Sequence, residues 1–182
     1  KLAKYTTKGE TVELIAQDDT PDLGGMGEVA LLGDERTLPL SNIAFEAFVE
    51  GSSAPLENGA VVSLDRGAGG SKIVFRAAGP NGVPLERFYV FDPDSYVIRS
   101  GVRFGSAGLP FVRSVRWGFG PGLRPTETNV VEDMAALRAS LRLGEEYHRK
   151  KRGDFDEKFS GTVDWVSLQV KYFTVALISQ TP

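Results

Sequence analysis

The strongest constraint on the fold is a series of short apolar runs that alternate with turn-forming residues. The runs AVVSL, KIVFRAA, LERFYVF and YVIRSGVRF cover residues 60–64, 72–78, 85–91 and 96–104, and RGAGGS, GPNG and DPDS separate them. β-Branched and aromatic residues favour strands, whereas Gly, Pro, Asn and Asp favour tight turns. The pattern predicts an antiparallel meander of short strands.

Alternation in the last of these runs predicts one buried and one wetted face. The buried face would carry Tyr96, Ile98, Ser100, Val102 and Phe104, and the wetted face Arg99 and Arg103. A further strand is expected at 113–117. A helix is expected at 134–143, although its second half alternates like a strand, and a charged loop is expected at 145–156.

The most apolar segment is GTVDWVSLQVKYFTVALI, residues 161–178. A membrane-spanning helix needs ~20 mostly apolar residues. Asp164, Gln169 and Lys171 interrupt the segment, and a charge at the centre of a membrane helix costs ~2.5–3.5 kcal/mol. The segment is therefore not expected to span a membrane.

A period of two in this segment predicts a single core strand instead. Val166, Leu168, Val170 and Tyr172 would share one face, and β-branched residues favour a strand. A helix remains open, because the spacing also puts apolar residues on one helical face.

Composition limits the classes of function. The 182 residues include 21 basic and 24 acidic side chains, a net charge of −3, and no cysteine. Such a charge gives no general attraction to nucleic acid. The lack of cysteine excludes disulfides, a thiolate nucleophile and cysteine-bound metals. With 21 glycines and 10 prolines, we expect one all-β, antiparallel domain over residues 1–182, with at most one or two short helices.

No set of residues predicts catalysis, a metal site or a cofactor. The single histidine, His148, lies in the charged run EEYHRKKRGD, which is most simply a solvated loop. No GxSxG motif is present, and no Gly-rich segment is followed by GKS or GKT. We therefore expect a protein that is not an enzyme.

Two other groups of residues have both a functional and a structural interpretation. Asp92 and Asp94 could act as paired carboxylates of a glycosidase type, but Asp-Pro-Asp-Ser between strands is also typical of a β-turn. The basic run 148–152 could contact anionic lipid, but the acidic residues that flank it in the sequence favour a solvated loop.

Two tryptophans are candidates for stacking on a ligand. Trp117, with Arg116 beside it, and Trp165 are the only weak ligand-binding candidates in the chain. Aromatic residues at strand positions are more often part of a core.

Four segments, in order, resemble the periplasmic domain of YidC-type membrane protein insertases. They are KYTTKGETVELI near the start, ERFYVFDPDSYVIRSGVRF, RWGFGPGL and VDWVSLQVKYFTVALI. The second matches that family's hairpin through Asp92 and Tyr96. The third resembles its W-G-P-G-L loop, with Phe119 as an extra residue, and the fourth its W-x-x-x-x-x-K-Y-F strand. The matching residues of these last two segments are Trp117, Gly120, Pro121, Gly122, Trp165, Lys171, Tyr172 and Phe173.

The resemblance implies a fold and a cellular role. The fold would be an antiparallel β-supersandwich of the galactose-mutarotase type. The parent protein would be a chaperone for protein transport in the bacterial inner membrane, which helps to insert and fold membrane proteins. This domain would be a non-catalytic part on the periplasmic face, a scaffold or docking surface for Sec translocon components or nascent membrane proteins. The family's domain continues past the KYF strand, so the resemblance also implies that the C-terminal end is incomplete here.

Two other functions remain open. A carbohydrate-binding or carbohydrate-active supersandwich would use Trp117, Trp165 and the pair Asp92 and Asp94. The sugar chemistry of mutarotases needs two histidines and a glutamate, and this chain has one histidine. A weaker possibility is a chaperone that binds apolar peptides along a sheet edge.

Overall fold

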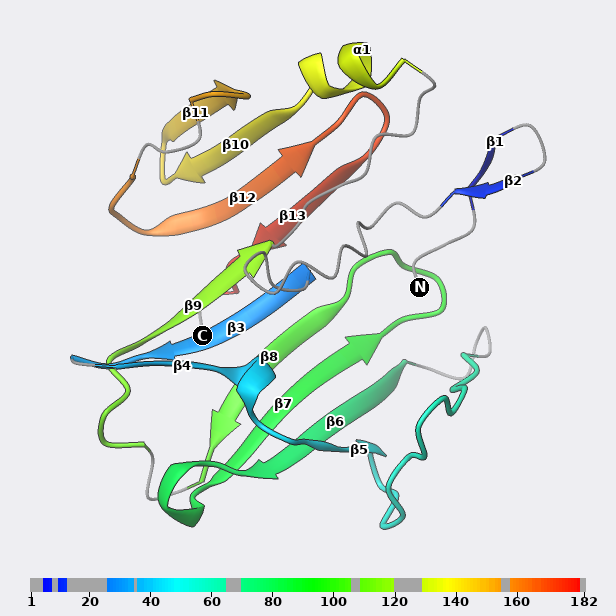
Figure 1. The fold of residues 1–182 in the computed structure, drawn as a ribbon, viewed down its shortest axis with the longest axis vertical. Helices are drawn as coiled ribbons and strands as arrows, with labels where there is room; N and C mark the ends of the chain where they lie inside the picture. The colour runs from blue at the N-terminus through cyan, green and yellow to red at the C-terminus, as the bar shows by residue number, and fades with distance from the viewer. Residues whose placement is uncertain are drawn as a thin grey trace. The chain divides into compact units, whose positions relative to one another are not determined.

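The computed structural model describes residues 5–7, 10–12, 26–34, 36–64, 70–105, 109–119, 129–154 and 158–180. In this part of the chain the fold is mainly antiparallel β-sheet, with one α-helix and two short 3-10 turns (Figure 1). The predicted all-β, antiparallel class is therefore confirmed. The chain forms two compact units, one of residues 28–117 and one of residues 1–27 with 118–182.

The unit of residues 28–117 contains most of two sheets. The first has the order β4-β3-β9, formed by β3 (Met26–Leu32), β4 (Thr37–Pro39) and β9 (Ser114–Phe119). The second has the order β5-β6-β7-β8, formed by β5 (Glu46–Val49), β6 (Ser71–Ala78), β7 (Pro84–Phe91) and β8 (Arg99–Phe104). All neighbours in the second sheet are antiparallel and consecutive in sequence, which confirms the predicted meander (Figure 1).

An apolar core joins these two sheets. Its fully or nearly buried members are Val29, Leu31, Leu40, Leu85 and Leu109. Hydrophobic side chains from β4, β8 and β9 pack against them. Burial of each large aliphatic side chain contributes about 1.5–3 kcal/mol. Because strands of both sheets supply this inter-sheet core, the unit is a β-sandwich.

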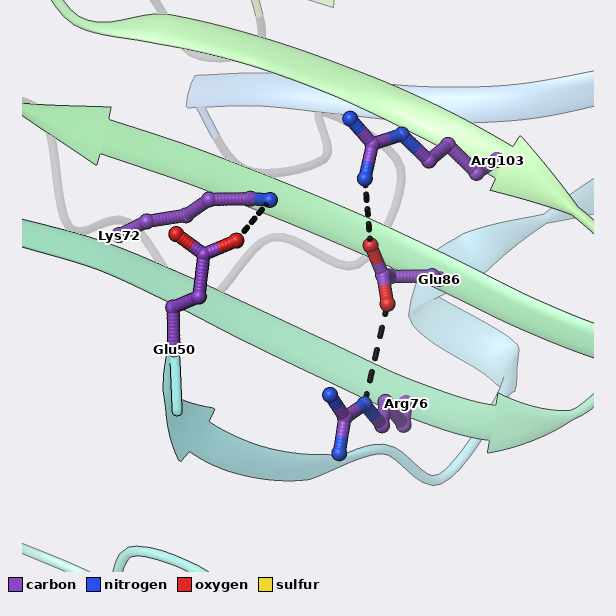
Figure 2. A network of polar contacts seen from close by, with 5 residues as sticks. All are labelled: Glu50, Lys72, Arg76, Glu86 and Arg103. Atoms are coloured by element: carbon purple, nitrogen blue, oxygen red, sulfur yellow. Dashed lines mark hydrogen bonds and ion pairs between the residues drawn. The ribbon is translucent and has the colours of Figure 1, made fainter. Parts of the chain in front are cut away.

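The other face of the β5–β8 sheet carries charged side chains over a thin apolar strip. Figure 2 shows Glu86 on β7 between Arg76 on β6 and Arg103 on β8, with Glu50 beside Lys72. Glu86 Oε2 lies 3.7 Å from Arg76 Nε, and its Oε1 lies 3.3 Å from Arg103 Nη1. The cross-strand pairs follow from the register, in which Glu86 is directly opposite both arginines.

Phe88 lies under these cations. The Lys72 Nζ is 5.1 Å from the centre of the Phe88 ring, and the Arg103 guanidinium carbon is 4.7 Å from it. The same ring covers Gly101, where an added Cβ would come within 2.6 Å of the ring. Glycine on β8 therefore makes room for an aromatic side chain that the cations shield from water.

One predicted strand is absent from this unit, and another begins later than predicted. Residues 60–64 form no strand, because the place beside β6 that they would take belongs to β5. The last strand begins at Arg99 and not at residue 96, since a turn extends further, and Tyr96 is 92% exposed. Within β8, Val102 and Phe104 do pack against the inter-sheet core, as the alternation predicted.

The described part of the second unit contains a short hairpin, a helix and a four-stranded sheet. The hairpin is β1 (Tyr5–Thr7) with β2 (Glu10–Val12), and the helix is α1 (Val130–Ala135). The sheet has the order β11-β10-β12-β13. Its strands are β10 (Arg138–Leu143), β11 (Glu146–Lys151), β12 (Val163–Gln169) and β13 (Thr174–Ile178).

The prediction of a helix at 134–143 is wrong for most of that range. The helix lies earlier and ends at Ala135, and Asn129 caps its start by accepting a hydrogen bond from the Glu132 amide at 3.2 Å. Arg138–Leu143 is instead a central strand that pairs on both sides. Hydrogen bonding on two sides outweighs the helix propensity of Leu and Arg.

The charged segment 145–156 was predicted to be a loop, and this is wrong for Glu146–Lys151. These residues form β11, which pairs with β10 along its full length. A strand at the edge of a sheet can carry many charges, because its side chains meet water and charge discourages pairing with other chains.

The single core strand predicted at 161–178 is two strands. A turn joins β12 to β13, and in it the Val170 amide donates to the Phe173 carbonyl at 2.9 Å. Val166 and Leu168 do share a face, as predicted, but Tyr172 is 59% exposed at the turn. Lys171 and Tyr172 are the two central residues of this turn.

Gly33 should resist substitution, because a Cβ there would lie 2.5 Å from the Phe111 carbonyl oxygen. We expect Gly33→Ala to lower the free energy of unfolding by about 1–3 kcal/mol through this backbone clash. Urea denaturation measures it, with Thr37→Ala on an exposed neighbouring position as the control. Equal stability of Gly33→Ala and wild type would refute the close approach.

Glu86→Gln removes the shared partner of Arg76 and Arg103. Because both arginines are more than half exposed, we expect a loss of about 0.5–1 kcal/mol that shrinks at high salt. The measurement is urea denaturation at two salt concentrations. Glu57→Gln, on an exposed loop, should show neither the loss nor the salt dependence. A loss independent of salt would contradict an electrostatic origin.

Candidate functional site

A groove lies in the unit of residues 28–117. Its volume is about 690 Å³. Side chains of β5 and β6 form its floor, among them Ala47, Ile73 and Phe75, and residues 55–60 with Val62 form its wall. The lining is mixed, with apolar side chains beside Glu46 and Glu57.

The wall of the groove is held by backbone hydrogen bonds to β5. The Leu56 amide donates to the Ala47 carbonyl at 2.6 Å, and the Ser52 amide donates to the Val49 carbonyl at 2.9 Å. These bonds bring the loop back along β5. Val61, next to the wall, is 88% exposed, so an apolar side chain is available to a partner.

Aromatic rings continue the floor of the groove across the sheet. Phe75 contacts Tyr89 edge to face, with ring centres 5.9 Å apart, and Tyr89 stacks on Phe91 at 6.3 Å. The Arg87 guanidinium lies 5.0 Å from the Tyr89 ring and 5.9 Å from the Trp117 ring. Burial raises the pKa of Tyr89 above its ordinary value of 10.0, while the neighbouring Arg87 opposes that rise.

Trp117, a weak ligand-binding candidate of the sequence, packs against the inter-sheet core. It is half-buried, and Arg116, its neighbour on β9, is exposed. Successive side chains on a strand point to opposite faces. The structure therefore does not bring Arg116 and Trp117 together in one site.

Asp92 caps the turn between β7 and β8. Its Oδ1 accepts a hydrogen bond from the Asp94 amide at 2.9 Å, and its carbonyl accepts one from the Ser95 amide at 3.2 Å. This is the β-turn role that the sequence offered for the Asp92 and Asp94 pair. Tyr96, which follows, is exposed. Gly120, Pro121 and Gly122 lie outside the described residues.

The residues of the last motif occupy the β12–β13 hairpin. Trp165 on β12 lies 5.9 Å from the Tyr147 ring, measured between ring centres. Lys171 Nζ donates to Glu132 Oε1 at 3.2 Å and lies 5.3 Å from the Tyr172 ring. The hydrogen bond with Glu132 raises the pKa of Lys171. Phe173 is half-buried at the end of the turn.

His148 is on β11 and not in a loop. Its ring lies 4.5 Å from the Phe159 ring, and its Nε2 is 3.3 Å from Glu146 Oε2. Across the described ranges, no three His, Asp or Glu side chains are grouped so that they could hold a metal ion. The contacts of His148 are those of a packed surface side chain.

Sequence reasoning missed the groove. Its wall comes from residues 55–62, the last three of which were expected to begin a strand at 60–64, and its floor comes from β5 and β6. The sequence signal was Asn58-Gly59, a turn dipeptide directly before this run; in the structure Gly59 has φ of +82° and Val61 is exposed.

Comparisons with known proteins give no relative. No family model, curated protein or solved structure matches the chain. In the described part of the chain, no helix has the length and apolar character to cross a membrane.

Tyr89 should titrate above the ordinary tyrosine range. Because its folded pKa is raised, its contribution to stability is complete below about pH 10, where unfolded tyrosine ionises, and is lost as the pH rises through the folded value. Absorbance at alkaline pH should show a late-titrating component that Tyr89→Phe lacks. If Tyr89→Phe removed only an ordinary component, burial of this hydroxyl would be refuted.

Proposed function

We propose that the chain is a non-catalytic docking domain of a YidC-type insertase, on the periplasmic face of the bacterial inner membrane. The observation that carries the proposal is the order of four segments that resemble that family along the chain. In support, the described parts of these segments are strands and hairpins: β1–β2, β7–β8, β9 and β12–β13.

The groove beside β5 suits a docking role. Its floor of Ala47, Ile73 and Phe75 offers apolar area, and the acidic residues Glu46 and Glu57 line the same groove. Partner sites of this kind combine an apolar centre with polar groups at the rim. We propose that a Sec translocon component or a nascent membrane protein docks here.

Two features of the carbohydrate alternative have structural roles in the described chain. Trp117 packs against the inter-sheet core, Trp165 belongs to the other unit, and Asp92 caps a turn. The docking role is therefore the better-supported proposal.

The proposal can be tested in the complete protein encoded by the gene. The reading frame should encode a hydrophobic helix of ~20 residues before this domain and several after it. A photo-crosslinking residue at Val62, in the groove, should then give products with translocon subunits or nascent chains in cells.

The matched position is Tyr96, which is exposed at a turn outside the groove. Crosslinks of equal yield from Val62 and Tyr96 would argue against docking in the groove. A reading frame without hydrophobic helices on both sides would refute the insertase assignment itself.

A further inference from the structure

In the β11-β10-β12-β13 sheet, the alternation of side chains places several cationic residues on one face. The register assigns twelve residues to this basic face: Arg138, Ser140, Arg142, Tyr147, Arg149, Lys151, Trp165, Ser167, Gln169, Thr174, Ala176 and Ile178. Four of these residues are cationic and none is acidic. The face is therefore positive although the chain has a net charge of −3.

Two of the four cations are engaged by the protein. Arg138 donates to the Ala135 carbonyl at 2.6 Å and to the Leu137 carbonyl at 2.8 Å. Arg142 donates to the Gly144 carbonyl at 2.8 Å and lies 3.6 Å from Asp164. Because these carbonyl groups carry no net charge, they do not neutralise Arg138, which still contributes its positive charge to the electrostatic potential of the basic face.

The other two cations, on edge strand β11, face water. Arg149 and Lys151 are exposed, and neither forms an ion pair with a residue of the described ranges. They are two positions apart on one strand, so their Cα atoms are about 6–7 Å apart. Both are free to contact an external anion.

Aromatic and aliphatic side chains lie among these cations. Tyr147 is 57% exposed, contacts the Trp165 ring and bonds Ser140 Oγ through its hydroxyl at 3.2 Å. Ile178, at the opposite edge of the sheet, is 66% exposed. Tyr and Trp beside Lys and Arg are typical of surfaces at the level of lipid head groups.

Because side chains alternate between the two faces of β11, charged residues that are adjacent in the sequence point to opposite faces. Glu146 and His148 on β11 point away from the basic face, as does Lys150 between the two free cations. Glu145 lies in the turn before the strand and Asp154 in the segment after it. Glu146, the acidic residue of β11 itself, is thus on the opposite face from Arg149 and Lys151.

We propose that the basic face binds the anionic head groups of a phospholipid membrane. The four cations are distributed over two neighbouring strands, β10 and β11, on one side of the sheet, which fits a broad anionic surface. An acidic peptide would follow one groove or edge, whereas exposed Tyr147 and Ile178 add apolar contacts that a lipid interface accepts.

Each cation near an anionic membrane surface contributes ~1 kcal/mol, or about five-fold in partitioning. Removing both Arg149 and Lys151 should therefore weaken binding by about 25-fold. The interaction should also fall steeply with salt, because charges in water are screened beyond ~10 Å at moderate ionic strength.

The test is co-sedimentation of the whole chain with vesicles of phosphatidylcholine, with and without phosphatidylglycerol. The variant is Arg149→Gln with Lys151→Gln. The matched control is Arg99→Gln with Lys150→Gln, which removes the same charge from the other unit and from the opposite side of β11. Circular dichroism and a urea midpoint confirm that each protein is folded.

We expect binding only to the vesicles with phosphatidylglycerol, lost at high salt, about 25-fold weaker in the variant and within two-fold of wild type in the control. Equal weakening in variant and control would overturn the proposal, because net charge alone would then explain binding. Equal binding to neutral vesicles would also overturn it. So would binding of a polyglutamate peptide, dependent on Arg149 and Lys151, without binding to vesicles.

Discussion

Packing between two sheets is the interaction on which the unit of residues 28–117 depends. Leu31 on β3 and Leu85 on β7 are 0% and 1% exposed, and they meet in one core although more than fifty residues separate them in the chain. This contact fixes which face of the β5–β8 sheet is inside. The far part of that inner face then forms the floor of the groove. The outer face is left to the ion pairs of Figure 2 and to Phe88, which the cations shield.

Strands with clear alternation between strong turn signals could be predicted from the sequence. β6, β7 and β8 are examples, because Gly-Pro-Asn-Gly and Asp-Pro-Asp-Ser mark both turns. Residues 60–64 are also an apolar run between turn signals, but they form no strand. A segment joins a sheet only beside a strand with a free edge, and β5 already occupies that position beside β6. The prediction could not include that competition between β5 and residues 60–64.

In the other unit, local preference and tertiary structure disagree. Arg138–Leu143 contains good helix formers but lies between two strands, and Glu146–Lys151 has the composition of a loop but pairs along its length. The Lys-Tyr-Phe motif was placed inside a strand and lies at a turn. Because residues 146–151 were predicted to be a loop, the basic face was not predicted. In a strand, successive side chains point to opposite faces, so the acidic residue of this run is separated from two of its cationic residues, which a loop would not do.

The two units also differ in how the chain builds them. One is a continuous stretch, residues 28–117, and the other needs residues 1–27 together with 118–182. A ribosome releases the chain from its N-terminus, and domains generally fold as units during synthesis. The inter-sheet core can thus form while the other unit still lacks every strand of its four-stranded sheet.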